Sequence, residues 1–520
     1  MSASQPGPSE SSEKAVVPPH GPKPPAVPLP EPTSHATRHT VTVGGTELAY
    51  EATVATTLIE TEKVKPAASV FHAAFVALPD GEQPDPSRPV TFLFNGGPGS
   101  ATTFLLLGSV APRRISTPGT GPVVGAPYDF VDNPQSLLPI TDLVFIDAPG
   151  AGFSQVAEEA KPELWSVDGD VAGFVQFIRR WLSAHGRWNS PKYVLGESYG
   201  TTRGCALTLA LLEAEVSLAG LVLVSSILDY GPHEGINDQG YVAFLPTYAA
   251  IAHYHGRAGR DVAAAEHVQR AREFATGPYR LALAAGSRLS VEETNAVAAT
   301  YAELTGLSAD YVVRSGLRVL DHRFRKELLR DEQRIVGRYD GRVAGYDLDA
   351  ASDAETFVVD DAYLSPAYGS LVNAYLRDEL GWQDPEERKS FAGFDWDSSE
   401  PGKGWVWKHK MPAGTKTFGG REATYPCVVP DLAAALVRHP RLKVLAANGY
   451  FDLATPFFQT ELDLAHLGVP TALLANLART YYRAGHMLYT SEDDLTKFVA
   501  DLGRFYAAEP GGVQEIDELG

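Results

Sequence analysis

A serine between two glycines, directly after an apolar run typical of a buried strand, most constrains the fold of this chain. The segment Val194–Gly200 reads VLGESYG, and residues 201–215 follow as an Ala/Leu-rich stretch of helical length without proline. In such a strand-turn-helix the serine backbone is strained and its hydroxyl exposed, while the glycines let neighbouring chain pass without a Cβ clash. The pattern predicts a nucleophile at Ser198. An ordinary strand-to-helix junction with an incidental serine is the alternative.

Two residues near the C-terminus can serve as the base and the acid that activate a serine. An apolar run, 442–447, ends in the turn Asn448–Asp452, which predicts Asp452 at the C-terminal edge of a strand. His486 follows a glycine in a loop between aromatic and apolar residues. The chain order Ser198, Asp452, His486 is that of the α/β-hydrolase fold and differs from the chymotrypsin and subtilisin orders. Asp452 as an ordinary turn residue and His486 as an ordinary loop histidine are the alternatives.

A glycine-rich loop follows another strand-like run. Val90–Phe94 is apolar, and Asn95–Ser100 then reads NGGPGS, which leaves backbone N–H groups free to point at a ligand. Loops of this kind form oxyanion holes, where the loss of one donor costs about 3 kcal/mol of transition-state stabilisation. A phosphate-binding loop is not expected, because no Lys-Ser/Thr pair follows the glycines.

Five motifs together resemble the serine carboxypeptidase family, and they extend from about residue 90 to about residue 490. They are NGGPG at Asn95–Gly99, IDAPGAGFS at Ile146–Ser154, GESYG at Gly196–Gly200, the turn Asn448–Asp452, and GHM at Gly485–Met487. The combination is much more specific than any single motif. The resemblance implies an α/β-hydrolase fold, with a mostly parallel sheet covered by helices on both faces, and a serine-type carboxypeptidase activity on peptides.

The resemblance also implies roles for residues of these motifs. The backbone amides of Gly97 and Tyr199 would form the oxyanion hole, and Asn95 and Glu197 would bind the terminal carboxylate of the substrate. Met487 would lie in the substrate pocket. A glutamate beside a bound carboxylate must share a proton with it, because like charges in contact raise one pKa strongly, and a preference for acidic pH would follow. A glutamate that only orients the following helix is the alternative.

The chain departs from the better-known family pattern beside the glycine-rich loop. Ser109 stands where those enzymes have a second carboxylate, and Arg203 lies one helical turn from Ser198. With Arg113 and Arg114 also near, a guanidinium could hold the substrate carboxylate in place of proton-sharing acids. The working pH should then move toward neutral. Pairing of these arginines with surface acids is an equally good interpretation.

Charge and cysteine content limit the partners and the compartment. The formal net charge of −20 at pH 7, without a basic stripe, disfavours nucleic acids and anionic membranes as partners. Cys205 and Cys427 imply no disulfide framework, and no signal peptide is visible. We therefore expect a cytoplasmic enzyme that acts on peptides, with a homodimer left open. No cofactor or metal is expected, because His253 and His255 lack a third ligand at suitable spacing.

Composition divides the chain into a core, an insertion and two tails. Residues 1–36 are rich in Pro, Ser and Glu, which predicts disorder. Long Ala/Leu/Arg-rich helical patterns, with a capping box at Ser290–Glu293, predict a helical cap over the mouth of the site. The predicted division is tail 1–36, core 37–228, cap 229–380, core 381–510 and acidic tail 511–520.

The pattern of apolar residues predicts the strands of the core. Segments 39–54 and 68–78 alternate apolar and polar residues, with a turn at Gly44-Gly45, which predicts antiparallel strands at an edge. Continuous apolar runs, typical of parallel strands covered on both faces, occur at 89–94, 142–146, 192–195, 220–225 and 442–447.

These observations predict a peptidase that forms an acyl-enzyme at Ser198. An esterase or acyltransferase is the first alternative, because the same intermediate accepts other donors and acceptors. A requirement for a free carboxylate on the substrate would distinguish them. A catalytically inactive peptide-binding protein is the alternative from another class, and complete inertness toward a serine-directed phosphonate would support it.

Overall fold

The computed structural model describes residues 28–512 apart from 80, 124, 235–236, 385–386, 416–419 and 421. Most of the Pro-rich segment 1–36 and of the acidic tail 511–520 therefore lies outside the described residues. Strand β1 (Ser34–Val43) begins within the last residues of the predicted N-terminal tail. Among the described residues, no helix has both the length and the apolar character needed to cross a membrane.

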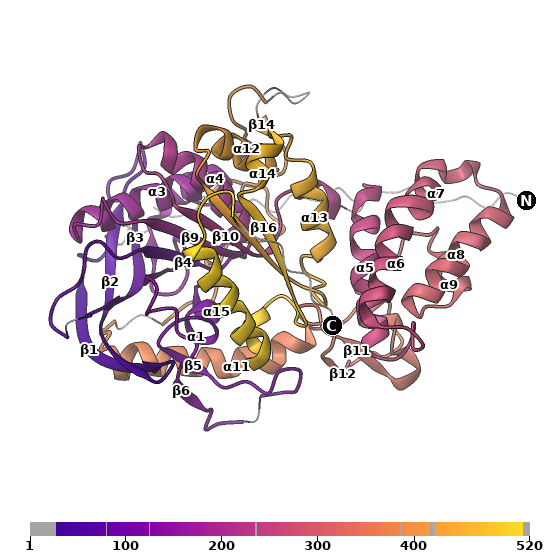
Figure 1. Ribbon diagram of the computed structural model, residues 1–520, viewed down its shortest axis with the longest axis horizontal. Helices are drawn as coiled ribbons and strands as arrows, with labels where there is room; N and C mark the ends of the chain where they lie inside the picture. Colours follow the sequence, from indigo (N-terminus) through magenta and orange to yellow (C-terminus); the bar gives the residue numbers. More distant parts are fainter. Residues whose placement is uncertain are drawn as a thin grey trace, which may run out of the picture.

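A mixed β-sheet forms the centre of the molecule (Figure 1). In the described part of the chain it has ten strands in the order β1-β2-β3-β7-β4-β9-β10-β15-β16, with β8 paired to β3. The strands from β1 to β7 in this order pair antiparallel, and those from β7 to β16 pair parallel. The remaining bounds are β2 (Thr46–Ile59), β3 (Ala68–Ala77), β4 (Val90–Phe94), β7 (Asp142–Ile146), β8 (Gln155–Val156), β9 (Lys192–Ser198), β10 (Gly220–Ser226), β15 (Lys443–Gly449) and β16 (Leu477–Tyr482).

The predicted strands are confirmed to within a few residues, and two further strands, β8 and β16, join them in the described sheet. The apolar runs become β4, β7, β9, β10 and β15, whose residues are almost all buried, as expected for strands with helices on both faces. The sequence does not predict β16, because Arg479 and Thr480 interrupt its apolar residues. Its register is set by parallel pairing with β15, from Val444 opposite Leu477 to Gly449 opposite Tyr482.

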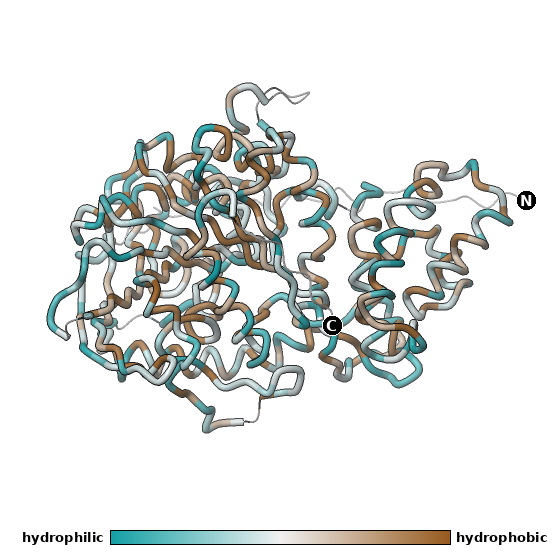
Figure 2. Tube along the Cα trace, viewed as in Figure 1, coloured by the Kyte–Doolittle hydropathy of each residue, from teal (hydrophilic) through white to brown (hydrophobic). Residues whose placement is uncertain are grey.

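Different helices cover the two faces of the sheet. Along β4, Phe92 and Phe94 join one apolar core and Leu93 joins the other, since successive side chains point to opposite faces. Because both faces of the sheet are covered, the central strands consist largely of apolar residues, which are brown in Figure 2. The first core includes α3 (Val167–Ala184), α4 (Tyr199–Glu213) and α12 (Val429–Arg438), and the second includes α1 (Thr103–Gly108), α11 (Val359–Ala374) and α15 (Glu492–Ala507).

The inserted segment builds a separate helical body beside the sheet, next to α13 (Phe457–Ala465), as Figure 1 shows. Its own apolar core is shared with α13. The predicted capping box is confirmed, since the Ser290 hydroxyl accepts from the Glu293 amide and the Glu293 carboxylate accepts from the Ser290 amide. Its helices are α5 (Asp238–Tyr254), α6 (Ala264–Phe274), α7 (Arg280–Ala285), α8 (Val291–Thr305), α9 (Ala309–Arg314) and α10 (Asp321–Glu327).

The later part of the insertion returns to the core. A hairpin of β11 (Arg334–Val336) and β12 (Ala344–Tyr346) is followed by α11, which contacts α1 on the sheet. Leu364, Tyr368 and Val372 on α11 belong to the core of the sheet and not to that of the helical body. The segment 229–380 therefore has two structural parts, the helical body and α11. The apolar face of α11 packs on the core of the sheet.

Candidate active site

The predicted nucleophile lies in a sharp turn between β9 and α4. The backbone of Ser198 has φ 60° and ψ −130°, a conformation that residues other than glycine rarely adopt. A Cβ on Gly196 would overlap the carbonyl oxygen of Gly200, and one on Gly200 would come within 2.9 Å of the Phe94 carbonyl oxygen. Glycine is therefore required on both sides of the turn. The Ser198 side chain lines a cavity of about 790 Å³.

The glycine-rich loop after β4 packs its backbone directly against this turn. A Cβ on Gly96 would lie 2.5 Å from the Tyr199 amide nitrogen and 2.7 Å from the Glu197 carbonyl oxygen. Gly97 has φ 106°, and it lines the same cavity as Ser198. Tyr199 is the first residue of α4, where a backbone N–H has no acceptor inside the helix. The amides of Gly97 and Tyr199 thus remain our prediction for the oxyanion hole, and their loops are adjacent.

Asp452 and His486 form a buried pair. The Asp452 carboxylate oxygen Oδ2 lies 2.8 Å from Nδ1 of His486. The other oxygen, Oδ1, accepts from the amides of Ala454 at 2.8 Å and Thr455 at 2.9 Å, and the Thr455 hydroxyl donates to Oδ2 at 2.7 Å. These hydrogen bonds hold the Asp452 carboxylate in position against Nδ1 of His486. The Nε2 atom of His486 remains for the nucleophile, and both His486 and Ser198 line the cavity.

The hairpin loop between β11 and β12 braces His486. The amide of His486 donates to the Tyr339 carbonyl oxygen at 2.5 Å, and the Tyr339 ring stacks on the imidazole with centroids 5.5 Å apart. A Cβ on Gly485 would overlap the same carbonyl, which explains the glycine before the histidine. The Gly341 amide donates to the Phe451 carbonyl oxygen at 2.9 Å. The inserted segment therefore contacts the loops of both the acid and the base.

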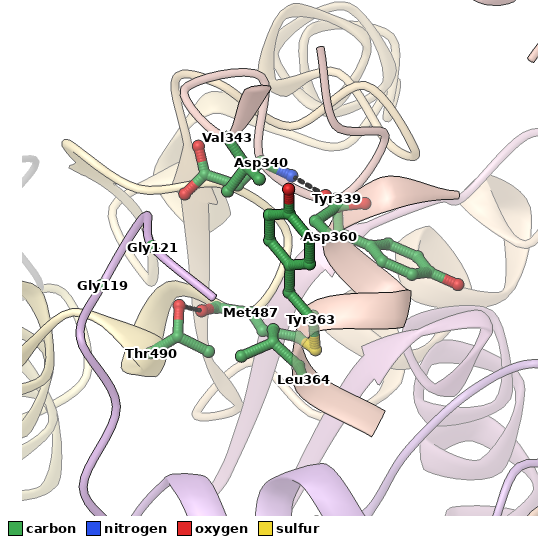
Figure 3. A pocket seen from close by; sticks show the side chains of 10 residues that line it. All are labelled: Gly119, Gly121, Tyr339, Asp340, Val343, Asp360, Tyr363, Leu364, Met487 and Thr490. Carbon is green, nitrogen blue, oxygen red and sulfur yellow. Dashed lines mark hydrogen bonds between the residues drawn. The ribbon is translucent and has the colours of Figure 1, made fainter. Parts of the chain in front are cut away.

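Asp360 and Met487 surround a smaller cavity behind this loop (Figure 3). The Asp360 carboxylate accepts from the Asp340 amide at 2.6 Å and thereby holds the loop that carries Tyr339. Met487, the predicted pocket residue, lines both this cavity and the larger one. The methionine thus contributes to the walls of both cavities.

Glu197 and Asn95 form a second buried pair in the cavity wall. The Asn95 side-chain amide donates to Oε1 of Glu197 at 2.8 Å, and its carbonyl Oδ1 accepts from the Leu105 amide at 3.1 Å. The other carboxylate oxygen, Oε2, makes no well-directed hydrogen bond in the described part of the chain, although the Tyr489 hydroxyl lies within reach of this carboxyl and lowers its pKa. Burial raises the pKa of Glu197 to about 7. This carboxyl can therefore be protonated near neutral pH.

The pKa of His486 depends on both carboxyls. Burial alone lowers it, but the negative charges of Asp452 and Glu197 outweigh burial and raise the pKa above its ordinary value of 6.5. Asp452 adds a hydrogen bond to this effect. Ionisation of Glu197 therefore favours the protonated form of the base, and the two groups titrate as a coupled pair.

The prediction that arginines near the elbow hold a substrate carboxylate is wrong. Arg203 is fully buried behind the site, where it pairs with Asp170 at 2.7 Å and donates to the Asn95 carbonyl oxygen at 2.9 Å. Arg113 pairs with Asp132 and Glu379, and Arg114 pairs with Glu492. All three guanidinium groups therefore pair with carboxylates of the protein outside the cavity, which was the alternative interpretation. Arg203 supports the site from behind, through the backbone of Asn95.

Other cavity residues lie far from the motifs in sequence. Arg338 and Arg388 line the cavity, and the Arg388 guanidinium donates to the Thr103 hydroxyl at 2.7 Å and pairs with Asp147 at 3.4 Å. One wall is aromatic, with Tyr230, Phe391, Trp396 and Trp407. No local pattern in the sequence indicated the two arginines.

A buried histidine fastens the segment that carries the aromatic wall. His409 Nδ1 lies 2.7 Å from Asp168 and its Nε2 lies 3.0 Å from Asp431. Burial lowers the pKa of His409, but hydrogen bonds to the two carboxylates outweigh it and raise the pKa to about 9. The charged imidazolium thus links the segment after Trp407 to the N-terminal turns of α3 and α12.

The two histidines at the C-terminal end of α5 have a packing role. His253 Nε2 lies 3.0 Å from the Val262 carbonyl oxygen, and His255 Nε2 lies 2.8 Å from the Gly341 carbonyl oxygen. Among the described residues, no group of three or more His, Cys, Asp or Glu side chains could hold a metal ion.

Comparisons with known proteins agree with this architecture. Residues 64–230, which contain the glycine-rich loop and Ser198, match the family model of the serine carboxypeptidases. No curated protein matches the chain. The structure is similar to Kex1Δp, a prohormone-processing carboxypeptidase from Saccharomyces cerevisiae, with 14% identity, 92% of each chain covered and a TM-score of 0.51. A proline iminopeptidase from Mycobacterium smegmatis matches with 12% identity, 90% of this chain and 97% of that chain covered, and a TM-score of 0.32.

The structural likeness and the family match concern different extents of the chain. The likeness to Kex1Δp covers nearly the whole chain and concerns the fold alone, whereas the family match concerns the segment that carries Ser198. We conclude that this chain has the α/β-hydrolase fold and that its residues 64–230 match the family model of the serine carboxypeptidases.

Proposed function

We propose that the protein is a serine-type carboxypeptidase that hydrolyses the last peptide bond of peptides with a free C-terminus. Ser198 is the nucleophile, His486 the general base and acid, and Asp452 the residue that orients His486. The amides of Gly97 and Tyr199 stabilise the oxyanion. Glu197 and Asn95 bind the terminal carboxylate.

One observation carries the choice of a carboxypeptidase over an esterase. Glu197 precedes the nucleophile in the wall of the same cavity, and its Oε2 makes no well-directed hydrogen bond in the described part of the chain. An unpaired buried carboxyl oxygen is costly, by about 1–3 kcal/mol, unless a ligand satisfies it. A protonated Glu197 can donate from Oε2 to a carboxylate, whereas it offers no comparable advantage to an uncharged amide or ester group.

The proposed reaction has two acyl-transfer steps. The Ser198 hydroxyl adds to the scissile carbonyl carbon while its proton passes to Nε2 of His486, and the carbonyl oxygen becomes the oxyanion. The C–N bond then breaks as His486 returns that proton to the departing amino group. In the second step water attacks the acyl-enzyme, His486 accepts a water proton, and the proton returns to Ser198 as the shortened peptide leaves.

The first test compares a blocked dipeptide with its C-terminal amide. We expect kcat/KM for the free acid to exceed that for the amide at least about tenfold, because a hydrogen bond to a charged group contributes about 1.5–3 kcal/mol. The measurement is the release of the terminal amino acid or its amide between pH 4 and 9. Equal rates on acid and amide, or faster cleavage of the matching ester without any need for the carboxylate, would move the assignment to an esterase or acyltransferase.

The pH profile gives a second test through Glu197→Gln. In the wild type, kcat/KM should fall as pH decreases and His486 becomes protonated, and it should also fall above about pH 7, as Glu197 ionises and repels the substrate carboxylate. With glutamine the alkaline fall should disappear. The acid limb should move to lower pH, because one negative charge that raises the His486 pKa is gone. The C-terminal amide is the matched control, since its alkaline limb should not depend on a carboxylate. An alkaline limb unchanged in the variant would refute the role of Glu197.

We further propose that the enzyme acts on peptides in the cytoplasm. Cys205 is buried, Cys427 is half-buried, and both are free thiols, which suits a reducing compartment. Cell fractionation with activity assays tests this location.

A further inference from the structure

The proposed carboxylate site lacks enough donors if it consists only of Asn95 and Glu197. The Asn95 side-chain amide already donates to Glu197, and its Oδ1 accepts from Leu105. The arginines expected to assist are committed elsewhere, and Ser109 donates to the Leu105 carbonyl oxygen at 2.5 Å. A bound carboxylate has two oxygens and about four lone-pair directions to satisfy. A bound carboxylate therefore needs further neutral or cationic hydrogen-bond donors near Glu197.

Tyr368 on α11 provides such a donor. It is 1% exposed and lines the large cavity beside Ser198, Asn95 and Glu197. Its hydroxyl has no hydrogen-bond partner in the described part of the chain. The ring is fixed against Phe104, with centroids 4.5 Å apart. A rigid, buried and unpaired hydroxyl in the wall of a substrate cavity is a preformed hydrogen-bond donor.

Tyr489 stands next to Tyr368. A Cβ on Gly108 would lie 2.6 Å from the Tyr368 hydroxyl oxygen and 2.7 Å from Cε2 of Tyr489, so both tyrosines cover the same glycine. The Tyr489 hydroxyl makes no well-directed hydrogen bond among the described residues, but it lies within reach of the Glu197 and Asn95 side chains. Burial and the nearby Glu197 carboxyl raise the pKa of both tyrosines, which keeps the two hydroxyls protonated as donors.

Other buried tyrosines show what distinguishes Tyr368. Tyr301 and Tyr375 also have hydroxyls without partners in the described residues, but neither lines the cavity. An orphan hydroxyl alone therefore indicates nothing about a ligand. The location of Tyr368, in the wall that Glu197 and Ser198 share, is the additional observation.

We infer that the hydroxyl of Tyr368, with Tyr489 beside it, donates hydrogen bonds to the terminal carboxylate of the substrate and completes the site of Asn95 and Glu197. The inference rests on the proposed carboxypeptidase function. Two neutral donors replace a second proton-sharing acid and add no negative charge, so only one proton must be shared. The ligand chemistry is a free α-carboxylate adjoining the scissile bond.

The experiment measures kcat and KM of Tyr368→Phe on N-benzyloxycarbonyl-Phe-Leu and on its C-terminal amide. Phenylalanine keeps the ring and removes only the donor. We expect KM for the acid to rise about ten- to a hundredfold with kcat nearly unchanged, because a hydrogen bond to a charged group is lost. The kcat/KM for the amide should not change. Tyr489→Phe should have a smaller effect in the same direction, and the double variant the largest.

Tyr375→Phe is the matched control, because it removes another buried, unpaired hydroxyl from a tyrosine packed on Phe130. It should leave both substrates unaffected. The rate of labelling by an uncharged fluorophosphonate reports activation of Ser198 independently of any carboxylate, and it should be equal in all variants.

The outcomes separate the two proposals. An acid preference that is undiminished in the double variant would overturn the inference and leave the carboxypeptidase assignment intact. Equal losses on acid, amide and phosphonate labelling would also overturn it, since they would show a structural role for the hydroxyls. A wild type without any acid preference, yet labelled by the phosphonate, would instead remove the carboxypeptidase function and the inference with it.

Discussion

Replacing Ser198 with alanine is expected to lower kcat by about 10⁵- to 10⁶-fold, the loss typical of a serine nucleophile. Alanine keeps the Cβ, so the turn at φ 60° and its flanking glycines experience no new contact. The remaining turnover would come from the oxyanion amides and from substrate binding. The measurement is single-turnover release of the terminal amino acid, together with incorporation of a fluorophosphonate.

Ser183→Ala on α3 is the control, because this serine is exposed and its hydroxyl bonds only to neighbouring residues of its own segment. It should retain full activity and labelling. A Ser198→Ala variant with more than about a tenth of the wild-type rate would show that another group attacks the substrate. Such a result would also remove the basis for the oxyanion hole at Gly97 and Tyr199.

The parts of the site that the sequence predicts are those under local backbone constraint. Gly196 and Gly200 are required by the backbone of the elbow itself, and Gly485 is required by the approach of the Tyr339 carbonyl. Such constraints leave glycines at fixed offsets from Ser198 and His486, which can be read without a structure. The place of the acid then follows from the continuous apolar run of β15, whereas the base is marked by the glycine that precedes it.

The parts that could not be predicted depend on which way a side chain turns or on partners distant in sequence. Arg203 lies one turn from Ser198, but α4 directs it toward Asp170 on α3 and away from the cavity. Arg388 reaches the cavity wall from a segment with no recognisable motif. Strand β16 depends on pairing with β15, and the residues of α11 could not be separated from the helical insertion by composition alone.

The inserted segment also has a structural role that its helical pattern did not suggest. In its hairpin loop, the Tyr339 carbonyl oxygen accepts a hydrogen bond from the His486 amide. The Gly341 amide donates to the carbonyl oxygen of Phe451, the residue before the catalytic acid. The Leu453 amide donates to the Arg338 carbonyl oxygen at 3.1 Å. Backbone bonds on both sides of Asp452 thus tie the insertion to the loops of the acid and the base. A change in this loop would therefore affect the geometry of His486 as well as access to the cavity.

The second large effect is expected from Asp452→Asn, which should lower kcat by about 10⁴-fold with little change in KM. Oδ1 accepts from two backbone amides, and Oδ2 accepts from the Thr455 hydroxyl and pairs with His486 Nδ1. An asparagine that keeps its oxygen toward the amides presents an NH₂ group to Nδ1. The imidazole must then accept at Nδ1 and carry its proton on Nε2, where it cannot take the proton of Ser198.

Asp463→Asn offers a closely matched control. Asp463 is a buried carboxyl on α13, it accepts a hydrogen bond from Gln459, and it does not line the cavity. Burial raises its pKa well above the ordinary value, so the surroundings of Asp463 disfavour the charged form that asparagine also lacks. This variant should keep nearly full kcat. Both variants should be compared by thermal unfolding, and a loss of kcat for Asp452→Asn no larger than that of Asp463→Asn would exclude Asp452 as the residue that sets the tautomer of His486.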